Sequence, residues 1–312
     1  MARASLFMVT SLAVSVAIVA PTVGSAQATT PLLGSVLGGS ALGARGTLVH
    51  PAAHVPALPP TTATSFIVAD ATTGQILAAR DVHGRLAPAS TLKILTAVTA
   101  FPWLSGSTRV VGSPAAAGVE GTQVGINAGQ TYTAKQLFTA MLVMSANDAA
   151  VSIGDAIGGG QKALSKMNAE AAHLQARDTV ARTTNGLDAP GQTSSAYDLA
   201  LIFRAGLANP RFRYYISLRS AVFPLANGKS YSIYTHDRLL NSYPGMIGGK
   251  NGYTIAANAS FVGAATRGGH TIIVAVMRDV PDFWPEVTSL LDWGFAADRH
   301  VQPVGYLVAP RK

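Results

Sequence analysis

Residues 259–277 read ASFVGAATRGGHTIIVAVM. Two apolar runs, 259–266 and 271–277, flank the tetrapeptide RGGH, whose two glycines are typical of a tight turn between antiparallel strands. The apolar residues that follow predict a closing helix over about 284–296. We therefore expect a β-hairpin and then a helix near the end of the chain.

The other end of the folded part predicts a second hairpin. The runs FIVA (66–69) and QILA (75–78) are strand-like, and DATTG between them has the composition of a turn. The long segment between the two hairpins predicts helices over 91–99, 133–144, 149–157, 161–174 and 195–208. We therefore predict an α+β fold, in which one antiparallel sheet is built from both chain ends with an inserted helical region.

The N-terminus is typical of an export signal. Arg3 supplies a positive charge, and an apolar run of roughly 15 residues follows, which is short for a membrane span of about 20. The tripeptide AQA at 26–28 fits a cleavage site, so residues 1–28 are expected to be a signal peptide. The same run, if uncleaved, would be an anchor helix. We predict three further parts, which are a Pro/Gly-rich linker, one domain and a C-terminal tail, at 29–63, 64–300 and 301–312.

The composition excludes several classes of protein. Charged residues are 12% of the chain and hydrophobic residues 48%, which excludes a disordered, highly charged protein. The absence of cysteine excludes a disulfide scaffold, a thiolate metal site, a cysteine nucleophile and a lipid-anchored cysteine. The net charge of +8 is compatible with an anionic partner, whether nucleic acid or another polymer.

The first candidate for chemistry is Ser90-Thr91-Leu92-Lys93. Residues three apart on a helix lie on one face, so the Lys93 amine can reach the Ser90 hydroxyl. Serine becomes a good nucleophile only when a base takes its proton, and lysine is such a base only when burial or another cation lowers its pKa. The simpler interpretation is an N-cap serine with a surface lysine.

A second candidate, Ser145-Ala146-Asn147, follows a Met-rich helix. A hydroxyl and an amide two residues apart in a loop can both face one cleft. The serine can then relay a proton, and the asparagine can bond a substrate peptide group. The simpler interpretation is a helix-end turn, where both residue types are common.

The third candidate is Lys250-Asn251-Gly252, ahead of the final hairpin. On an edge strand, Lys250 would offer a fixed positive charge, and Gly252 would let a substrate backbone approach closely. The simpler interpretation is a charged turn. Each of the three motifs is ambiguous alone, and their order along the chain makes them informative together.

The three motifs in this order resemble those of the penicillin-binding enzymes and serine β-lactamases. Longer segments are more specific, namely PASTLK (88–93), the run from GQTYT to MSANDAA (129–150), TNGLD (184–188) and GGKNGYT (248–254). They resemble low-molecular-mass D-alanyl-D-alanine carboxypeptidases, the penicillin-binding proteins of peptidase family S11. The resemblance covers roughly 64–297. With 16 Arg against 7 Lys, the chain is most similar to actinobacterial members.

The resemblance implies a β-lactamase/transpeptidase-like fold and an exported enzyme of the periplasm-like space, cell wall or exterior. Such an enzyme trims the terminal D-Ala from peptidoglycan stem peptides ending in D-Ala-D-Ala, and β-lactams inhibit it covalently. No cofactor, no metal, no nucleic-acid partner and no membrane span after signal cleavage are implied. Removing Arg3 with the signal leaves a charge of +7, which suits anionic cell-wall polymers or membrane surfaces.

The resemblance also implies roles for single residues. Ser90 would attack the D-Ala–D-Ala carbonyl, with Lys93 as its general base. Ser145 and the lysine network would protonate the leaving D-Ala, and water would hydrolyse the acyl-enzyme. The backbone N–H groups of Ser90 and Tyr253 would form the oxyanion hole.

Substrate binding would fall to the second and third motifs. Asn147 would orient the peptide, while Lys250, Asn251, Gly252 and Thr254 would face the substrate carboxylate. The family has threonine at position 251. An asparagine amide still donates a hydrogen bond but reaches further, and a misplacement of about 1 Å can lower a rate by about 100-fold. The substitution therefore bears on turnover and β-lactam affinity more than on the fold.

Several alternatives remain at the level of sequence. The motifs do not separate a carboxypeptidase from a D,D-endopeptidase, and Asn251 leaves open a catalytically weak peptidoglycan-binding homologue. A class A β-lactamase needs a Glu-x-x-Leu-Asn segment, which is absent. A zinc peptidase needs clustered histidines, and those of this chain are scattered. Arg267 and Arg278 are candidates for binding the substrate carboxylate.

Overall fold

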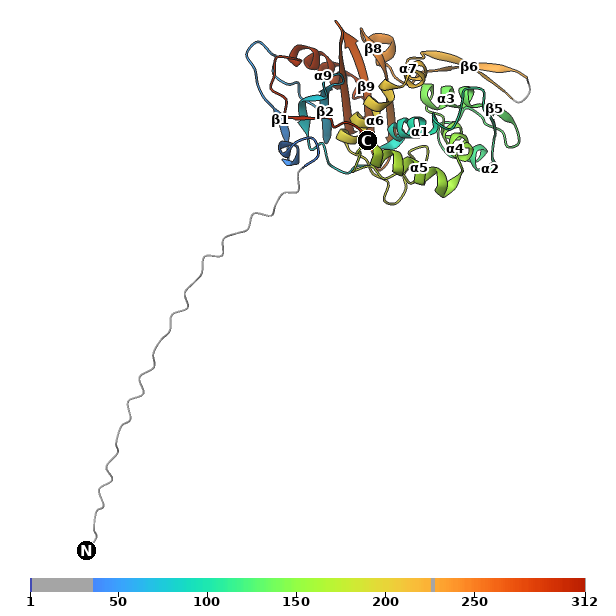
Figure 1. Ribbon diagram of the computed structural model, residues 1–312, viewed down its shortest axis with the longest axis horizontal. Helices are drawn as coiled ribbons and strands as arrows, with labels where there is room; N and C mark the ends of the chain where they lie inside the picture. The colour runs from blue at the N-terminus through green and yellow to red at the C-terminus, as the bar shows by residue number, and fades with distance from the viewer. Residues whose placement is uncertain (2–35, 226–227, 312) are drawn as a thin grey trace. The chain divides into compact units, whose positions relative to one another are not determined.

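The two predicted hairpins come together in one antiparallel sheet (Figure 1). Strand β2 (Ser65–Asp70), from the first hairpin, pairs with β10 (His270–Asp279), from the last, with Val68 opposite Val274. The order of the main path is β1-β3-β2-β10-β9-β8, and β11 also pairs with β3. The other strands of the sheet are β1 (Thr47–Val49), β3 (Gln75–Arg80), β8 (Met246–Thr254), β9 (Asn258–Arg267) and β11 (Gly305–Tyr306). The predicted α+β architecture, with a sheet assembled from both chain ends, is confirmed.

Residues 1, 36–225 and 228–311 are described by this computed structural model. Residues 35–312 form one compact unit. The predicted signal peptide, apart from Met1, lies outside the described residues. Within the described part of the chain, no helix is long and apolar enough to cross a membrane.

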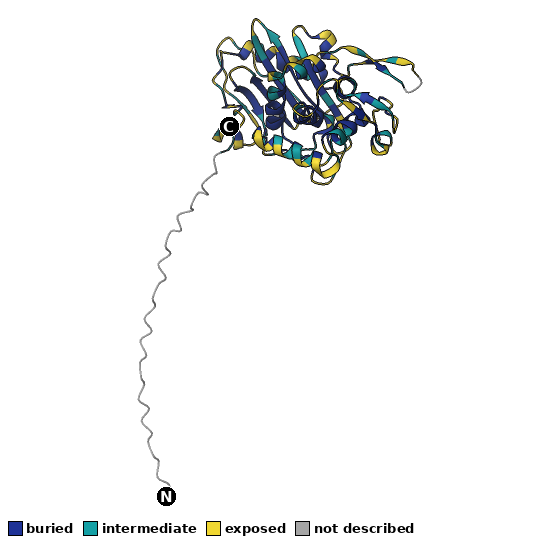
Figure 2. Cartoon of the chain, turned by 45° about the vertical axis from the view of Figure 1, so that its right-hand side comes forward, coloured by how far each residue is buried: buried dark blue, intermediate teal, exposed yellow. Residues whose placement is uncertain are grey.

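The central strands are buried on both faces because a helix covers each side (Figure 2). Successive side chains of a strand point to opposite faces. Ile67 accordingly joins the hydrophobic cluster that contains α6 (Ala196–Ala208), whereas Val68 joins the cluster that contains α9 (Trp284–Ala297). A Cβ built at Gly294 would lie 2.7 Å from a methyl group of Ile272, so this glycine lets α9 lie directly on the sheet.

The inserted region is helical, as predicted, and two of its helices begin at capping side chains. Thr133 and Gln136 form a reciprocal capping box, and the Ser195 hydroxyl accepts from the Asp198 N–H. Besides α6 and α9, the helices are η2 (Ala89–Leu92), α1 (Lys93–Ala100), α2 (Pro114–Ala117), α3 (Ala134–Val143), α4 (Asn147–Ala156), α5 (Gly160–His173), α7 (Pro210–Ile216) and α8 (Leu239–Ser242), with a short η1 at Ser40–Gly43. Two small two-stranded antiparallel sheets lie among them, β4 (Arg109–Val111) with β5 (Thr131–Thr133), and β6 (Ser220–Pro224) with β7 (Ser230–Tyr234).

The described part of the predicted linker, from residue 36 to 63, differs from the expectation. It contains β1, which extends the sheet, and the Trp293 indole donates to the Pro56 carbonyl at 2.9 Å. The predicted tail likewise contributes β11, whose Tyr306 pairs with Gln75. Neither segment shows a hydrophobic period in its sequence. Backbone pairing and scattered contacts at the edge of the sheet hold each segment, so its place in the fold does not depend on such a period.

Candidate active site

The first motif lies where η2 continues into α1, and it brings Ser90 and Lys93 together. The Lys93 ammonium nitrogen, Nζ, donates to Ser90 Oγ at 2.8 Å. Ser90 is therefore not an N-cap, and Lys93 is not on the surface, since its side chain is completely buried. This geometry is that of a nucleophile and its base.

Burial lowers the pKa of Lys93 well below its usual range, and the neighbouring Lys250 cation lowers it further. Asp148 acts in the opposite direction. The Asp148 carboxylate is itself held by four backbone N–H groups, those of Val124, Gly125, Ile126 and Ala149. The lowered pKa makes Lys93 readier to lose its proton, as a general base must be.

The second motif contributes Asn147 directly to this network. Asn147 Oδ1 accepts from Lys93 Nζ at 2.7 Å, and its Nδ2 donates to the Glu120 carbonyl at 2.7 Å. We expected Asn147 to orient the substrate, but here it holds the base and keeps one N–H for a further partner. Ser145 is buried with φ +67, and among the described residues its hydroxyl has no hydrogen-bond partner. No hydrogen bond therefore joins the Ser145 hydroxyl to Lys93 among the described residues, although the two side chains were predicted to act together.

A loop that the sequence analysis gave no role completes the environment of Lys93. The Asn185 carbonyl accepts from Lys93 Nζ at 2.6 Å, and the adjacent Thr184 carbonyl accepts from Thr96 on α1. Gly186 has φ +83, and a Cβ there would lie 2.0 Å from the Ala89 carbonyl oxygen. Only glycine lets this loop pass so close to the nucleophile. The segment TNGLD (184–188) contains this glycine and was the sequence signal for the loop, although it entered above only as part of the family resemblance.

The third motif lies on the edge strand β8, as expected, but Lys250 is not a fixed charge. Only 1% of its side chain is exposed, and burial lowers its pKa to about 7, while the Asp237 carboxylate opposes that shift. Its Nζ donates to the Asn251 carbonyl at 2.5 Å. Lys250 therefore titrates near neutral pH, so its charge depends on its surroundings.

Gly252 has a different role from the one expected. A Cβ at this position would lie 2.5 Å from the Ser90 backbone nitrogen and 2.8 Å from the Ala89 Cβ. The missing side chain thus lets β8 close onto the start of η2, rather than admitting a substrate backbone. The backbone of β8 at Gly252 therefore lies against the Ser90 nitrogen, and the peptide group of Tyr253 comes next along the strand.

Thr254 and Tyr253, at the end of β8, make different contacts. The Thr254 hydroxyl donates to Asp188 Oδ1 at 2.6 Å, which ties β8 to the 184–188 loop. Thr254 was predicted to face the substrate carboxylate, but it does not line the pocket beside the motif. Tyr253 does line that pocket, and 60% of its side chain is exposed.

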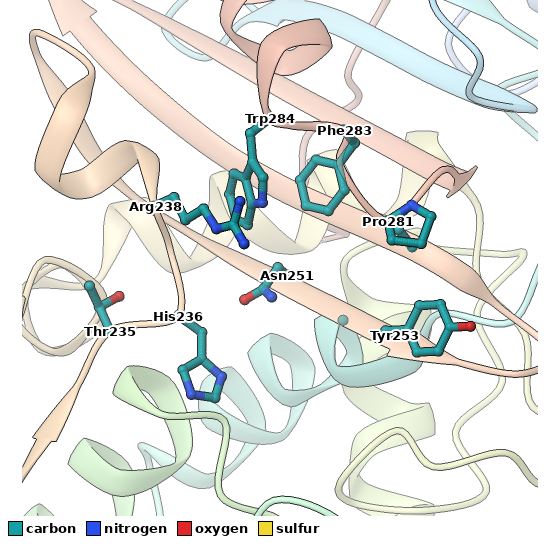
Figure 3. Close-up of a pocket in the computed structure, with 10 residues that line it drawn as sticks. Thr235, His236, Arg238, Asn251, Tyr253, Pro281, Phe283 and Trp284 are labelled. Carbon is teal, nitrogen blue, oxygen red and sulfur yellow. The ribbon is translucent and has the colours of Figure 1, made fainter.

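The pocket has a volume of about 430 Å³ (Figure 3). Asn251 lies between Arg238 and His236, with Trp284 beside the Arg238 guanidinium, whose carbon is 5.8 Å from the ring centre. The lining residues are Thr235, His236, Arg238, Asn251, Gly252, Tyr253, Ala259, Pro281, Phe283 and Trp284. No sequence motif marks His236 or Arg238, which precede the third motif by more than ten residues.

The two arginines proposed from the sequence lie elsewhere. Arg267 pairs with Asp292 at 3.0 Å and stacks on Tyr243, and Arg278 donates to the Ala256 carbonyl. Neither lines the pocket. Arg238 does, and its ion pair with Asp282, at 3.4 Å, joins two largely exposed side chains.

Within the described residues, no group of three or more His, Asp and Glu side chains could hold a metal ion. The residues that converge are instead a hydroxyl, a buried amine with a lowered pKa, a second buried lysine and the N–H groups of a strand edge. This set is suited to acyl transfer through a serine ester.

Comparison with known proteins gives a consistent result. The profile of the D-alanyl-D-alanine carboxypeptidase family, peptidase S11, matches residues 52–280. D-alanyl-D-alanine carboxypeptidase DacB2 of Mycobacterium tuberculosis is 45% identical over 80% of this chain and 87% of its own length. DacF of Bacillus subtilis is 29% identical, and the alignment covers 75% of this chain but only 62% of that longer protein.

Solved structures agree with this result. A D-alanyl-D-alanine carboxypeptidase from Mycobacterium tuberculosis superposes with a TM-score of 0.79 and 44% identity, covering 83% of this chain and all of the other. A mutant of the Streptomyces K15 DD-transpeptidase superposes with a TM-score of 0.73 and 26% identity, covering 76% of this chain and 99% of the other. The predicted β-lactamase/transpeptidase-like fold is therefore confirmed.

Proposed function

The chain belongs to the D-alanyl-D-alanine carboxypeptidase family, peptidase S11, and we propose that it removes the terminal D-alanine from peptidoglycan stem peptides through an acyl-enzyme on Ser90. The observation that carries this proposal is the 2.8 Å bond between the buried Lys93 amine and Ser90 Oγ. Fluorescent penicillin tests it, because a serine acyl-enzyme retains the label. A wild-type protein that takes no label would instead be a peptidoglycan-binding homologue.

Acylation follows from the arrangement of Ser90 and Lys93. Ser90 Oγ attacks the carbonyl carbon of the D-Ala–D-Ala bond, and its proton passes to neutral Lys93. The N–H groups of Ser90 and Tyr253 stabilise the oxyanion, since the Gly252 contact sets β8 against the nucleophile. The C–N bond then breaks as the leaving amine takes the proton back from Lys93. Ser145 relays this proton only after its hydroxyl, which makes no hydrogen bond to Lys93 here, turns toward the lysine and the amine. Water subsequently hydrolyses the ester.

The substrate carboxylate belongs in the pocket beside Asn251. The Asn251 amide and the Arg238 guanidinium line this pocket and supply the partners, and the buried Lys250, which does not line the pocket, adds its positive charge from behind when it is protonated. An arginine over a tryptophan ring keeps its planar face ordered and its N–H edge available to a carboxylate. Arg238 thus takes the role that the sequence analysis gave to Arg267 or Arg278.

Replacing Arg238 with leucine is expected to raise KM for a D-Ala-D-Ala peptide. A hydrogen bond to a charged group contributes about 1.5–3 kcal/mol, which corresponds to a loss of about 10- to 100-fold in kcat/KM. Steady-state D-alanine release measures this change. The matched control is Arg278→Leu, which removes an arginine outside the pocket. Equal kinetics for the two variants would exclude Arg238 from carboxylate binding.

Replacing Asn251 with threonine is expected to increase the rate of penicillin acylation. The shorter threonine side chain restores the family's hydroxyl at a position where placement within about 1 Å affects the rate by about 100-fold. Stopped-flow or quenched labelling gives the acylation rate constant. No gain in that rate would show that Asn251 is functionally equivalent to threonine.

We also propose that residues 1–28 direct export and that the enzyme acts in the cell wall or the periplasm-like space. The motifs of this chain and the D-Ala-D-Ala chemistry of its family support this location, where the positive charge meets anionic wall polymers. In that setting β-lactams would acylate Ser90 as substrate mimics, and the reaction would contribute to cell-wall remodelling and cell shape.

A further inference from the structure

The end of β8 carries the proposed oxyanion donor, the Tyr253 N–H, but its side chains hold it only weakly. The side chain of Tyr253 is 60% exposed, and that of Ile255, two residues further on, is 92% exposed. Among the described strands, β8 is an edge strand that pairs with β9 on one side only. The ends of such strands open easily. An oxyanion hole works only when its N–H groups are already in place, so this segment needs a further attachment.

A carboxylate from another loop provides this attachment. The Thr254 hydroxyl donates to Asp188 Oδ1 at 2.6 Å, and the Ala256 N–H donates to Asp188 Oδ2 at 3.2 Å. Thr254 Oγ1 in turn accepts from the Ala257 N–H at 3.1 Å. The two oxygens of Asp188 thus hold the turn between β8 and β9 on either side of Ile255. Hydrogen bonds to a carboxylate are stronger than those between neutral groups.

The loop that carries Asp188 is itself firmly held. Gln192 is buried, and its Oε1 accepts from the backbone N–H groups of Arg182 and Thr183 at 3.1 and 2.9 Å. Its Nε2 donates to the carbonyl of Leu187 at 2.7 Å. Because Leu187 immediately precedes Asp188, the aspartate stands on a loop that a buried amide fixes. Asp188 is therefore the fixed partner, and the end of β8 is the part that it steadies.

The same loop also contacts the other reacting groups. The Asn185 carbonyl accepts from Lys93 Nζ, and Gly186 lies against the carbonyl of Ala89 at the start of η2. Residues 185–188 thus join the base, the helix that carries the nucleophile and the end of β8. A shift of β8 relative to this loop would move the Tyr253 N–H away from the developing oxyanion.

We propose that Asp188 is a positioning residue of the D,D-peptidase site: by binding the Thr254 hydroxyl and the Ala256 N–H, it keeps the Tyr253 N–H aimed at the oxyanion. Neither Asp188 nor Thr254 lines the pocket beside the third motif, so both act through the backbone of β8. This inference rests on the proposed function and adds to it. It also gives Thr254 a role other than the predicted contact with the substrate carboxylate.

The proposal predicts that Asp188→Ala changes kcat rather than KM. We expect kcat to fall about 10- to 100-fold, because a displacement of about 1 Å lowers a rate by about 100-fold and complete loss of an oxyanion donor by about 10²- to 10³-fold. Formation and hydrolysis of the acyl-enzyme both pass through an oxyanion, so kcat falls whichever step limits. KM should stay within about twofold, because Asn251 and Arg238 remain in the pocket. Steady-state D-alanine release from a D-Ala-D-Ala peptide measures both constants.

The matched control is Asp155→Ala, near the end of α4. Asp155 Oδ2 accepts from the Ser113 hydroxyl at 2.6 Å, so this variant loses the same charge and the same kind of bond, outside the pocket beside the third motif. Asp155→Ala should match the wild type in kcat and KM. Equal kinetics for folded Asp188→Ala and Asp155→Ala, or a change in Asp188→Ala confined to KM, overturns the proposal.

Thr254→Val tests the same bond from β8, since valine keeps the shape of threonine and lacks its hydroxyl. We expect kcat to fall in this variant too, and the variant with both changes to be no slower than Asp188→Ala alone. Effects that multiply independently would overturn the proposal, because residues that act through one bond are not additive. If Asp188→Ala does not fold, Thr254→Val decides alone, and a wild-type kcat there overturns the proposal.

D-alanine release by the wild-type protein is measured first. No release removes the proposed function and this inference together. Normal release by the wild type, with unaffected Asp188→Ala and Thr254→Val proteins, removes only this inference.

Discussion

Ser90→Ala is expected to abolish acylation by penicillin, with a fall in rate of about 10⁴-fold or more. No other hydroxyl takes its place, because among the described residues Ser90 carries the hydroxyl that is hydrogen-bonded to the Lys93 amine. Mass spectrometry of the intact protein measures the result directly. The wild type should gain the mass of one penicillin, and the variant should gain none.

The variant should remain folded, which makes this result interpretable. Among the described residues, the Ser90 side chain is hydrogen-bonded only to Lys93, whose amine keeps its bonds to Asn147 and Asn185. The midpoint of thermal unfolding, Tm, should therefore stay close to that of the wild type. A folded Ser90→Ala protein that still gains one penicillin mass would place the nucleophile elsewhere.

Lys93→Met should lower the acylation rate by about 10² to 10⁴-fold while leaving Ser90 in place, because general base catalysis contributes a factor of that size. Burial and the Lys250 cation lower the pKa of Lys93. A lysine with a purely structural role would not need a lowered pKa, whereas a general base does. The acylation rate at saturating penicillin, followed from pH 5 to 9, measures the loss. Methionine fills a similar apolar volume but accepts no proton.

Lys93→Arg is the matched control for charge. Arginine can donate to the Asn185 carbonyl and the Asn147 amide oxygen, but it cannot be deprotonated. If Lys93 is the base, both variants lose acylation. If Lys93 serves only to hold the loop and the Asn147 side chain, Lys93→Arg keeps most of the activity, and that outcome would contradict its assignment as base. Unpaired acceptors in Lys93→Met should lower stability by about 1–3 kcal/mol each.

The central sheet and the main helices could be predicted because each has a local signal. The RGGH turn between two apolar runs specified β9 and β10, and the apolar patterns over 133–144 and 195–208 predicted α3 and α6. The pairing of β2 with β10 was expected only in outline, from the order of the elements. Edge strands such as β1 were not predicted, since three residues without a period gain their structure from pairing with β3.

The motifs located the reacting groups but not what surrounds them. Ser90 and Lys93 follow from their spacing on a helix, and the structure joins them. The Asn185 contact uses a backbone carbonyl, which any residue type could supply, so no side-chain pattern marks it. Arg238 is brought to the pocket beside β8 by the preceding loop, and contacts of that kind depend on the tertiary fold.

The most direct test of the central claim is the release of D-alanine from a purified stem pentapeptide ending in D-Ala-D-Ala. We predict that the wild-type protein releases one D-alanine per peptide, leaving a tetrapeptide, and that Ser90→Ala releases none. Release by Ser90→Ala at the wild-type rate, or no release by a folded wild-type protein that penicillin does not label, would contradict the assignment of a serine D-alanyl-D-alanine carboxypeptidase.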